Sequence, residues 1–117
     1  MSKVVTIYHN PRCSKSRQTL ALLNDKGLQP QIVEYLKTPP SAAELKRILK
    51  KLGAKPRDIV RKSEAVYVEL GLKDKDVSDD ELIALMSANP ILIERPIVVA
   101  GDKAAIGRPP EQVLKIL

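Results

Sequence analysis

The chain has 117 residues, of which 44% are hydrophobic, so it carries enough apolar surface for one domain of ordinary size and is not intrinsically disordered. Its formal net charge of +6 favours anionic partners, but without a long basic tract and with only 3% aromatic residues we expect no nucleic-acid binding. A single cysteine excludes an internal disulfide framework and a cysteine-based metal cluster, so we expect no metal and a reducing, cytoplasmic location. The N-terminus shows no signal-peptide pattern, and no apolar run approaches the ~20 residues of a membrane span.

The first third of the chain has the pattern of a strand, a helix and a second strand. Residues 4–8 are mostly β-branched and apolar, which predicts a buried strand. Residues 14–26 favour a helix, and Gly27 stands where a helix ends. Residues 31–35 predict the second strand. This order implies two parallel strands joined by a right-handed crossover.

The middle of the chain predicts helices and no strand. Ser41 with Glu44, and Ser78 with Glu81, have the spacing of a capping box, in which both side chains satisfy N–H groups at a helix start. Apolar residues follow each pair at helical spacing, and residues 56–70 predict one or two short helices. We interpret residues 41–89 as a helical insertion within a single domain that spans residues 1–117.

The last part of the chain returns to a strand pattern. Residues 97–100 and 104–106 flank a turn at Gly101 and predict a hairpin, and residues 111–117 predict a short helix after two prolines. If the hairpin joins the first two strands, the result is an α/β fold with a mixed four-stranded sheet.

The stretch between the first strand and the first helix, residues 9–13, holds the only cysteine, Cys13, and is called the cysteine loop below. Unpaired N–H groups and the helix dipole at a helix N-terminus stabilise a thiolate, which is the reactive form of cysteine. Arg12, Lys15 and Arg17 add positive charge nearby, and Ser16 can aim its hydroxyl at the sulfur. The alternative is an inert structural thiol, since free cysteines are often buried.

Four further residues are candidates by context. His9, the only histidine, either assists proton transfer at the thiolate or simply caps the end of the strand. Arg95 precedes a proline at a strand start, and Arg108 follows a strand end, so both can approach the cysteine loop. Arginine suits tetrahedral oxyanions because its planar fork makes paired hydrogen bonds. Arg61 is either a third such group or a solvated charge on a helix surface.

Several motifs, in this order along nearly the whole chain, closely resemble the glutaredoxin-dependent arsenate reductases of the ArsC/Spx superfamily, and in particular its short chromosomal members. They are Ile7-Tyr8-His9-Asn10-Pro11-x-Cys13-x-x-Ser16-Arg17, Tyr35-Leu36-x-x-Pro39-Pro40, Arg61-Lys62, Pro90-Ile91-Leu92-Ile93-x-Arg95-Pro96-Ile97-Val98-Val99 and Arg108-Pro109. The resemblance implies a thioredoxin-like fold with a helical insertion.

The resemblance also implies a role for each residue of the site. Cys13 would attack arsenate as a thiolate, with His9 and Ser16 supporting that thiolate. Three arginines would hold the oxyanion, and Pro96 would be the cis-proline that faces the cysteine loop. The three arginines are Arg61, Arg95 and Arg108.

Turnover requires an external thiol, because the chain has no second cysteine to resolve an adduct. The resemblance names that thiol: glutathione as co-substrate and glutaredoxin as protein partner, with no bound cofactor and a monomeric enzyme. Two alternatives stay open. One is a non-enzymatic regulator like the Spx proteins, which bind RNA polymerase. The other is a monothiol, glutathione-dependent oxidoreductase that acts on mixed disulfides.

Overall fold

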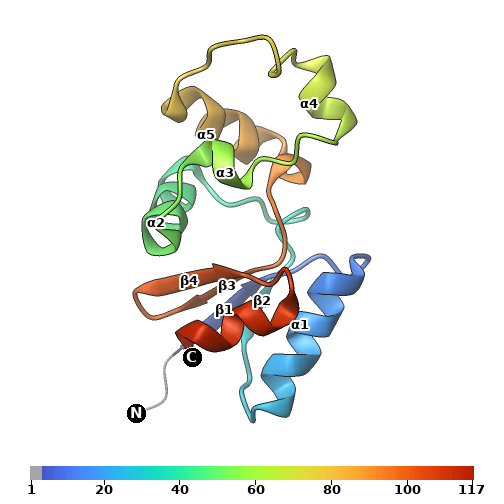
Figure 1. The fold of residues 1–117 in the computed structure, drawn as a ribbon, viewed down its shortest axis with the longest axis vertical. Coiled ribbons are helices and arrows are strands. Elements are labelled where there is room, and N and C mark those ends of the chain that lie inside the picture. Colours follow the sequence, from blue (N-terminus) through green and yellow to red (C-terminus); the bar gives the residue numbers. More distant parts are fainter. Residues whose placement is uncertain (1–3) are drawn as a thin grey trace. The chain divides into compact units, whose positions relative to one another are not determined.

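The computed structural model describes residues 4–117 and contains a four-stranded mixed β-sheet (Figure 1). The strands lie in the order β2-β1-β3-β4, with β1 parallel to β2, and β3 antiparallel to both β1 and β4. Their bounds are Val5–Tyr8 for β1, Gln31–Val33 for β2, Ile97–Ala100 for β3 and Lys103–Ile106 for β4. The predicted α/β fold with a mixed four-stranded sheet is confirmed. The prediction that the N-terminus is no signal peptide rests partly on residues 1–3, which lie outside the described residues.

The chain divides into two compact units. The sheet unit consists of residues 4–38 and 95–117, and the helical unit is Pro39–Glu94. The insertion predicted at residues 41–89 falls inside the helical unit, while the single-domain organisation of the whole chain stays a prediction.

The core of the sheet unit lies on one face of the sheet, under helix α1 (Ser14–Asp25) and the 3₁₀ helix η2 (Pro110–Ile116). Strand side chains alternate between faces, and Ile7 pairs with Val98 in the ladder, so both point to the same side. Leu23 from α1 and Val113 from η2 complete this buried cluster. The packing fixes the position of α1 against the end of β1, where the cysteine loop begins.

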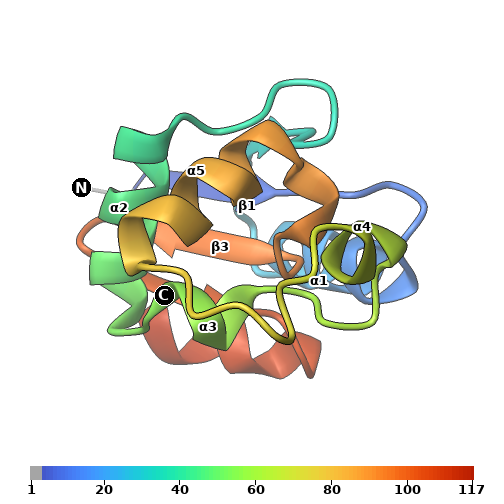
Figure 2. The ribbon, with the colours of Figure 1, turned by 90° about the horizontal axis from the view of Figure 1, so that it is seen from above.

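The helical unit begins and ends its longer helices as its sequence predicts. These helices are α2 (Ala42–Leu52) and α5 (Asp79–Ala88), which lie beside each other (Figure 2). Ser41 Oγ accepts the Glu44 N–H at 3.1 Å, and Ser78 Oγ accepts the Glu81 N–H at 3.2 Å. The shorter helices are α3 (Pro56–Ile59), α4 (Ala65–Glu69) and the 3₁₀ helix η1 (Pro90–Leu92).

Two element predictions need correction. The second strand ends at Val33, not at residue 35, because the N–H groups of Lys37 and Thr38 both donate to the Glu34 carbonyl at 2.9 Å and turn the chain. The C-terminal helix is a 3₁₀ helix that begins at Pro110. Among residues 4–117, no helix has the length and apolar character needed to cross a bilayer.

Candidate active site

Cys13 is the N-cap residue of α1, at the junction between the loop after β1 and the helix. Its backbone is extended, with φ −92° and ψ 123°, and its carbonyl accepts the Arg17 N–H at 3.0 Å. Its own N–H donates to the Asn10 carbonyl at 3.0 Å, which closes the preceding turn. The predicted strand–turn–helix setting of Cys13 is therefore what the structure has, and the sulfur is half-buried there.

The surroundings of Cys13 lower the pKa of its thiol below the usual value of 9.0. Burial is the largest single influence and acts in the opposite direction, since it raises the pKa. Several groups together outweigh it: the backbone N–H groups of Ser16 and Lys15, and the guanidinium of Arg95 through both its charge and a hydrogen bond. The thiolate is thus stabilised by the first turn of α1 and by one arginine.

His9, Ser16 and Asn10 form a hydrogen-bonded cluster behind the cysteine. Ser16 Oγ lies 2.6 Å from Nδ1 of His9 and accepts the Asn10 N–H at 3.0 Å. The expectation that this hydroxyl points at the sulfur is wrong, because these two partners hold it and only the backbone N–H of Ser16 reaches Cys13. The Ser16 hydroxyl therefore fixes the first turn of α1 to the end of β1.

The imidazole of His9 is buried, with 6% of its surface exposed, and its pKa lies below the usual 6.5. Burial is the largest cause; the Glu34 carboxylate raises the pKa, and the Arg17 guanidinium lowers it. Burial therefore favours the neutral ring, whose Nδ1 accepts a hydrogen bond from the Ser16 hydroxyl when the ring proton is on Nε2. Glu34 is a neighbour that the sequence did not single out, because nothing in a turn after a strand marks it.

Arg95 and Arg108 lie together in the sheet unit. Arg108 Nη1 donates to the Arg95 carbonyl at 3.4 Å, and Arg95 in turn contacts Cys13. The Arg95–Pro96 peptide bond is cis, as is Arg108–Pro109. Arg95 therefore reaches Cys13, and Arg108 reaches the backbone of Arg95, although neither arginine is near Cys13 in sequence.

Gly107 makes a close contact that brings these segments together. A Cβ atom there would lie 2.5 Å from Thr19 Oγ1 and 2.9 Å from Pro96 Cγ. Thr19 belongs to α1 and its hydroxyl donates to the Lys15 carbonyl at 2.8 Å. Only a residue without a side chain allows β4, the cis-proline and the first turns of α1 to approach this closely. Sequence reasoning missed this role, which a Gly-Arg-Pro triplet after a strand does not reveal.

Arg61 belongs to the helical unit, where its guanidinium forms an ion pair with Glu64. Arg61 Nη2 lies 2.7 Å from Glu64 Oε1, with side-chain exposures of 15% and 22%. Its backbone is also fixed, since the Arg61 N–H donates to the Leu92 carbonyl at 2.7 Å. The structure thus brings together Cys13, His9, Ser16, Arg95 and Arg108 in the sheet unit, and the part of Arg61 in that site stays a prediction.

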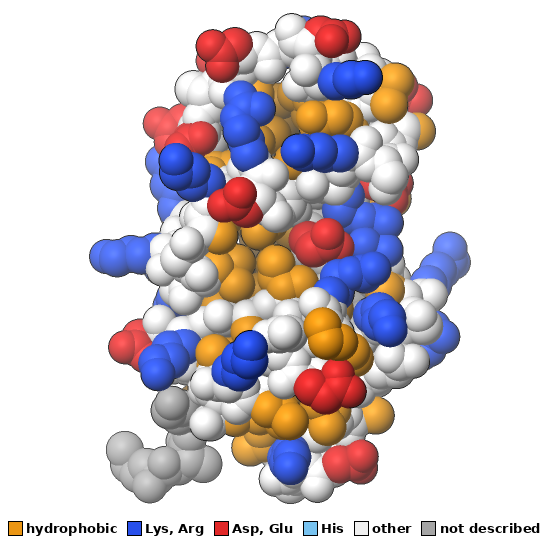
Figure 3. Space-filling model, viewed as in Figure 1, with side chains coloured by type: hydrophobic (Ala, Val, Ile, Leu, Met, Phe, Trp, Pro, Cys, Tyr) orange, Lys and Arg blue, Asp and Glu red, His pale blue; other side chains and the backbone are white. Residues whose placement is uncertain are grey.

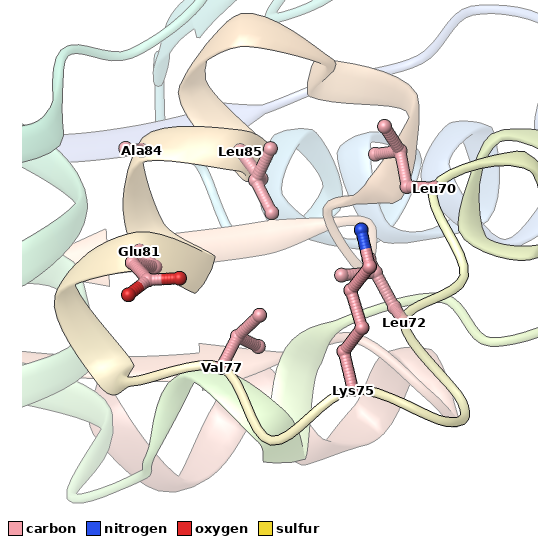
Figure 4. Close-up of a pocket in the computed structure, with 7 residues that line it drawn as sticks. All are labelled: Leu70, Leu72, Lys75, Val77, Glu81, Ala84 and Leu85. Atoms are coloured by element: carbon pink, nitrogen blue, oxygen red, sulfur yellow. The ribbon is translucent and has the colours of Figure 1, made fainter.

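Two cavities bear on the location of a ligand. A hollow of about 220 Å³ lies beside the cysteine loop and is lined by His9, Asn10, Pro11, Arg12, Glu34, Leu36 and Lys37. A larger pocket of about 430 Å³ lies within the helical unit and is mostly apolar, with Lys75 and Glu81 at its wall (Figure 4). It contains none of the predicted site residues. On the face shown in Figure 3, Lys and Arg side chains are interspersed with Asp and Glu.

The mixed sheet, a cysteine at the N-cap of the first helix, and an arginine that contacts this cysteine and precedes a cis-proline together define a thioredoxin-like protein with a single thiol at this position. The ArsC family model matches residues 8–116, and the chain belongs to this family. It is 54% identical to an arsenate reductase of Haemophilus influenzae, over 97% of this chain and 98% of that one. It is 56% identical to the uncharacterized protein YfgD of Escherichia coli, over 100% and 99% of the two chains.

A solved structure supports the same assignment. The arsenate reductase from Vibrio cholerae superposes with a TM-score of 0.96 at 54% identity, and the match covers 100% of both chains. This likeness confirms the thioredoxin-like ArsC fold that the sequence motifs imply.

Proposed function

We propose that this protein reduces arsenate to arsenite through an adduct on Cys13, with glutathione and glutaredoxin as the reductants. The observation that carries the proposal is the lowered pKa of the Cys13 thiol at the N-cap of α1, beside the guanidinium of Arg95. A Cys13 thiolate next to the Arg95 guanidinium can attack an anion that this guanidinium binds. The arsenate reductases among its relatives point to the same substrate.

In the first step the Cys13 thiolate attacks arsenic, and an arsenic–oxygen bond breaks. The leaving oxygen takes up protons and departs as water, so arsenic stays in the +5 state. Arg95 and Arg108 would bind the remaining oxygens and stabilise their negative charge in the transition state. Arg61 would supply a third guanidinium, as the family resemblance implies.

The electrons come from external thiols. Glutathione displaces a second oxygen as water and forms a bond between its sulfur and arsenic. A glutaredoxin thiolate then attacks that glutathione sulfur, so a disulfide forms while the electron pair of the sulfur–arsenic bond passes to arsenic. Arsenic is thereby reduced to +3, water hydrolyses its bond to Cys13, and arsenite leaves. The glutathionyl–glutaredoxin disulfide accounts for both electrons.

The cluster behind Cys13 would hold the thiolate in place without touching the substrate. The 2.6 Å contact between His9 Nδ1 and Ser16 Oγ fixes the turn whose N–H groups face the sulfur. Because Cys13 must stay reduced between turnovers, we further propose that the protein works in the cytoplasm. We propose that it acts as a monomer.

The test is NADPH consumption coupled to glutathione reductase, with glutathione and glutaredoxin present. We expect the rate to require arsenate and both thiols, and Cys13→Ser to lower it by about 10⁴-fold or more, to the background. A wild-type protein that shows no arsenate-dependent rate would refute the substrate. If glutathionylated peptides were instead reduced without arsenate, the monothiol oxidoreductase function would replace this proposal.

A further inference from the structure

The ion pair between Arg61 and Glu64 sets the charge available to a ligand at Arg61. The two side chains meet at 2.7 Å and are 15% and 22% exposed, so water screens them less than a surface pair. The other arm of the guanidinium, Nη1, donates to the Ile91 carbonyl at 3.5 Å. Both arms are therefore directed at groups of the protein itself.

The backbone around Arg61 is fixed by hydrogen bonds that do not involve its guanidinium. The Arg61 N–H is held by Leu92, and the neighbouring Glu94 N–H donates to the Ile59 carbonyl at 2.8 Å. The Glu64 carbonyl accepts the Tyr67 N–H at 3.1 Å at the start of α4, a bond that does not involve its carboxylate. An oxyanion that binds Arg61 therefore has to share its guanidinium with the Glu64 carboxylate or displace it.

From this geometry we infer that Glu64 is an internal competitor for Arg61 and determines which oxyanions the protein accepts. The inference rests on the proposed function, in which Arg61 binds the oxyanion. A carboxylate paired with the guanidinium offsets part of its positive charge, and this lost attraction costs a doubly charged ligand more than a singly charged one. Glu64 thus weakens the binding of dianions such as sulfate and doubly charged arsenate, and favours the singly charged form of arsenate.

The opposite role is that Glu64 orients Arg61 and helps it to bind. The two roles predict opposite signs, because losing a competitor tightens binding and losing a support weakens it. Glu64→Gln separates them, since glutamine keeps the size and the backbone bonds and removes only the charge. Glu69→Gln is the matched control, because Glu69 is exposed on α4.

The first measurement is steady-state kinetics with arsenate and with sulfate as a competitive inhibitor. For Glu64→Gln we expect KM for arsenate and the inhibition constant of sulfate to fall about three- to tenfold, with kcat nearly unchanged. The fall in KM should be larger at alkaline pH, where arsenate is doubly charged. Glu69→Gln should leave these constants as they are. A rise in KM, or a change equal to that of Glu69→Gln, would overturn the inference.

A double-mutant cycle tests whether the effect passes through Arg61. In an Arg61→Ala background the Glu64→Gln substitution should no longer lower KM, because no guanidinium remains for the carboxylate to occupy. If the substitution lowered KM equally in both backgrounds, Glu64 would act by its charge alone and the competition would be refuted.

Calorimetric titration of sulfate separates this inference from the reductase activity, since it needs no turnover. If wild type shows no arsenate-dependent rate, yet Glu64→Gln binds sulfate more tightly, the proposed substrate fails and the competition stands. If wild type turns over arsenate but sulfate binding is equal in both proteins, the competition fails and the activity stands.

Discussion

The two units present their arginines in opposite electrostatic settings. In the sheet unit, Arg95 faces a thiol and lowers its pKa. In the helical unit, Arg61 faces a carboxylate at 2.7 Å. An arginine therefore lowers the pKa of a thiol in one unit, and another arginine is paired with a carboxylate in the other. The groups that lower the pKa of Cys13, the first turn of α1 and Arg95, belong to the sheet unit.

The largest effect is expected for the substitution of Arg95, the arginine that contacts the thiol. Arg95→Ala should lower kcat/KM for arsenate, because the loss of a charge-assisted donor removes about 2 to 4 kcal/mol of transition-state stabilisation. It should also raise the pKa of Cys13, because Arg95 lowers that pKa in wild type. The midpoint of the pH profile for alkylation of Cys13 by iodoacetamide should therefore shift to higher pH, since only the thiolate reacts.

The control for Arg95 is Arg47→Ala, since Arg47 is exposed on α2. Its removal should change neither the kinetics nor the pH at which alkylation declines. Equal pH profiles for wild type and Arg95→Ala would show that Arg95 does not stabilise the thiolate.

A second prediction concerns the cluster behind the cysteine. Ser16→Ala should lower the free energy of unfolding by about 1 to 3 kcal/mol, because His9 Nδ1 and the Asn10 N–H each lose a buried partner. Urea denaturation measures the loss. Ser14→Ala is the control, because Ser14 lies two residues earlier and is exposed. A midpoint unchanged by Ser16→Ala would mean that water replaces the hydroxyl at no cost.

The last prediction compares one glycine from each unit. Gly107→Ala should cost about 1 to 3 kcal/mol through overpacking against Thr19 and Pro96, and it should also slow alkylation of Cys13 by displacing α1. Gly53→Ala meets no atom within 4 Å but has φ +66°, so it should cost about 1 kcal/mol through backbone strain alone. Alkylation that is slowed equally by both substitutions would contradict the separate roles of the two units.

Much of the fold could be predicted because local signals agree with the tertiary structure. The β-branched run at residues 5–8, the serine caps at Ser41 and Ser78, and the hairpin at Gly101 each correspond to an observed element. The length of β2 could not be predicted, because the turn that ends it depends on backbone hydrogen bonds from Lys37 and Thr38 to Glu34.

The site was predicted less completely than the fold. The position of Cys13 follows from sequence, since a strand, a proline turn and a helix start are all local features. The direction of the Ser16 hydroxyl could not be predicted, because it depends on His9, which follows β1 and places its Nδ1 2.6 Å from Ser16 Oγ. The pairing of Arg61 with Glu64 is a choice among partners that sequence spacing alone does not decide.

The most direct test of a covalent role for Cys13 is mass spectrometry of the protein incubated with arsenate and glutathione in the absence of glutaredoxin, where the reducing step is blocked and the adduct accumulates. We expect arsenic, with or without a glutathionyl group, on the peptide that contains Cys13 in wild type, and no arsenic on the same peptide in Cys13→Ser. The opposite result is the absence of arsenic from that peptide in wild type, together with arsenite formation at equal rates by wild type and Cys13→Ser once glutaredoxin is added.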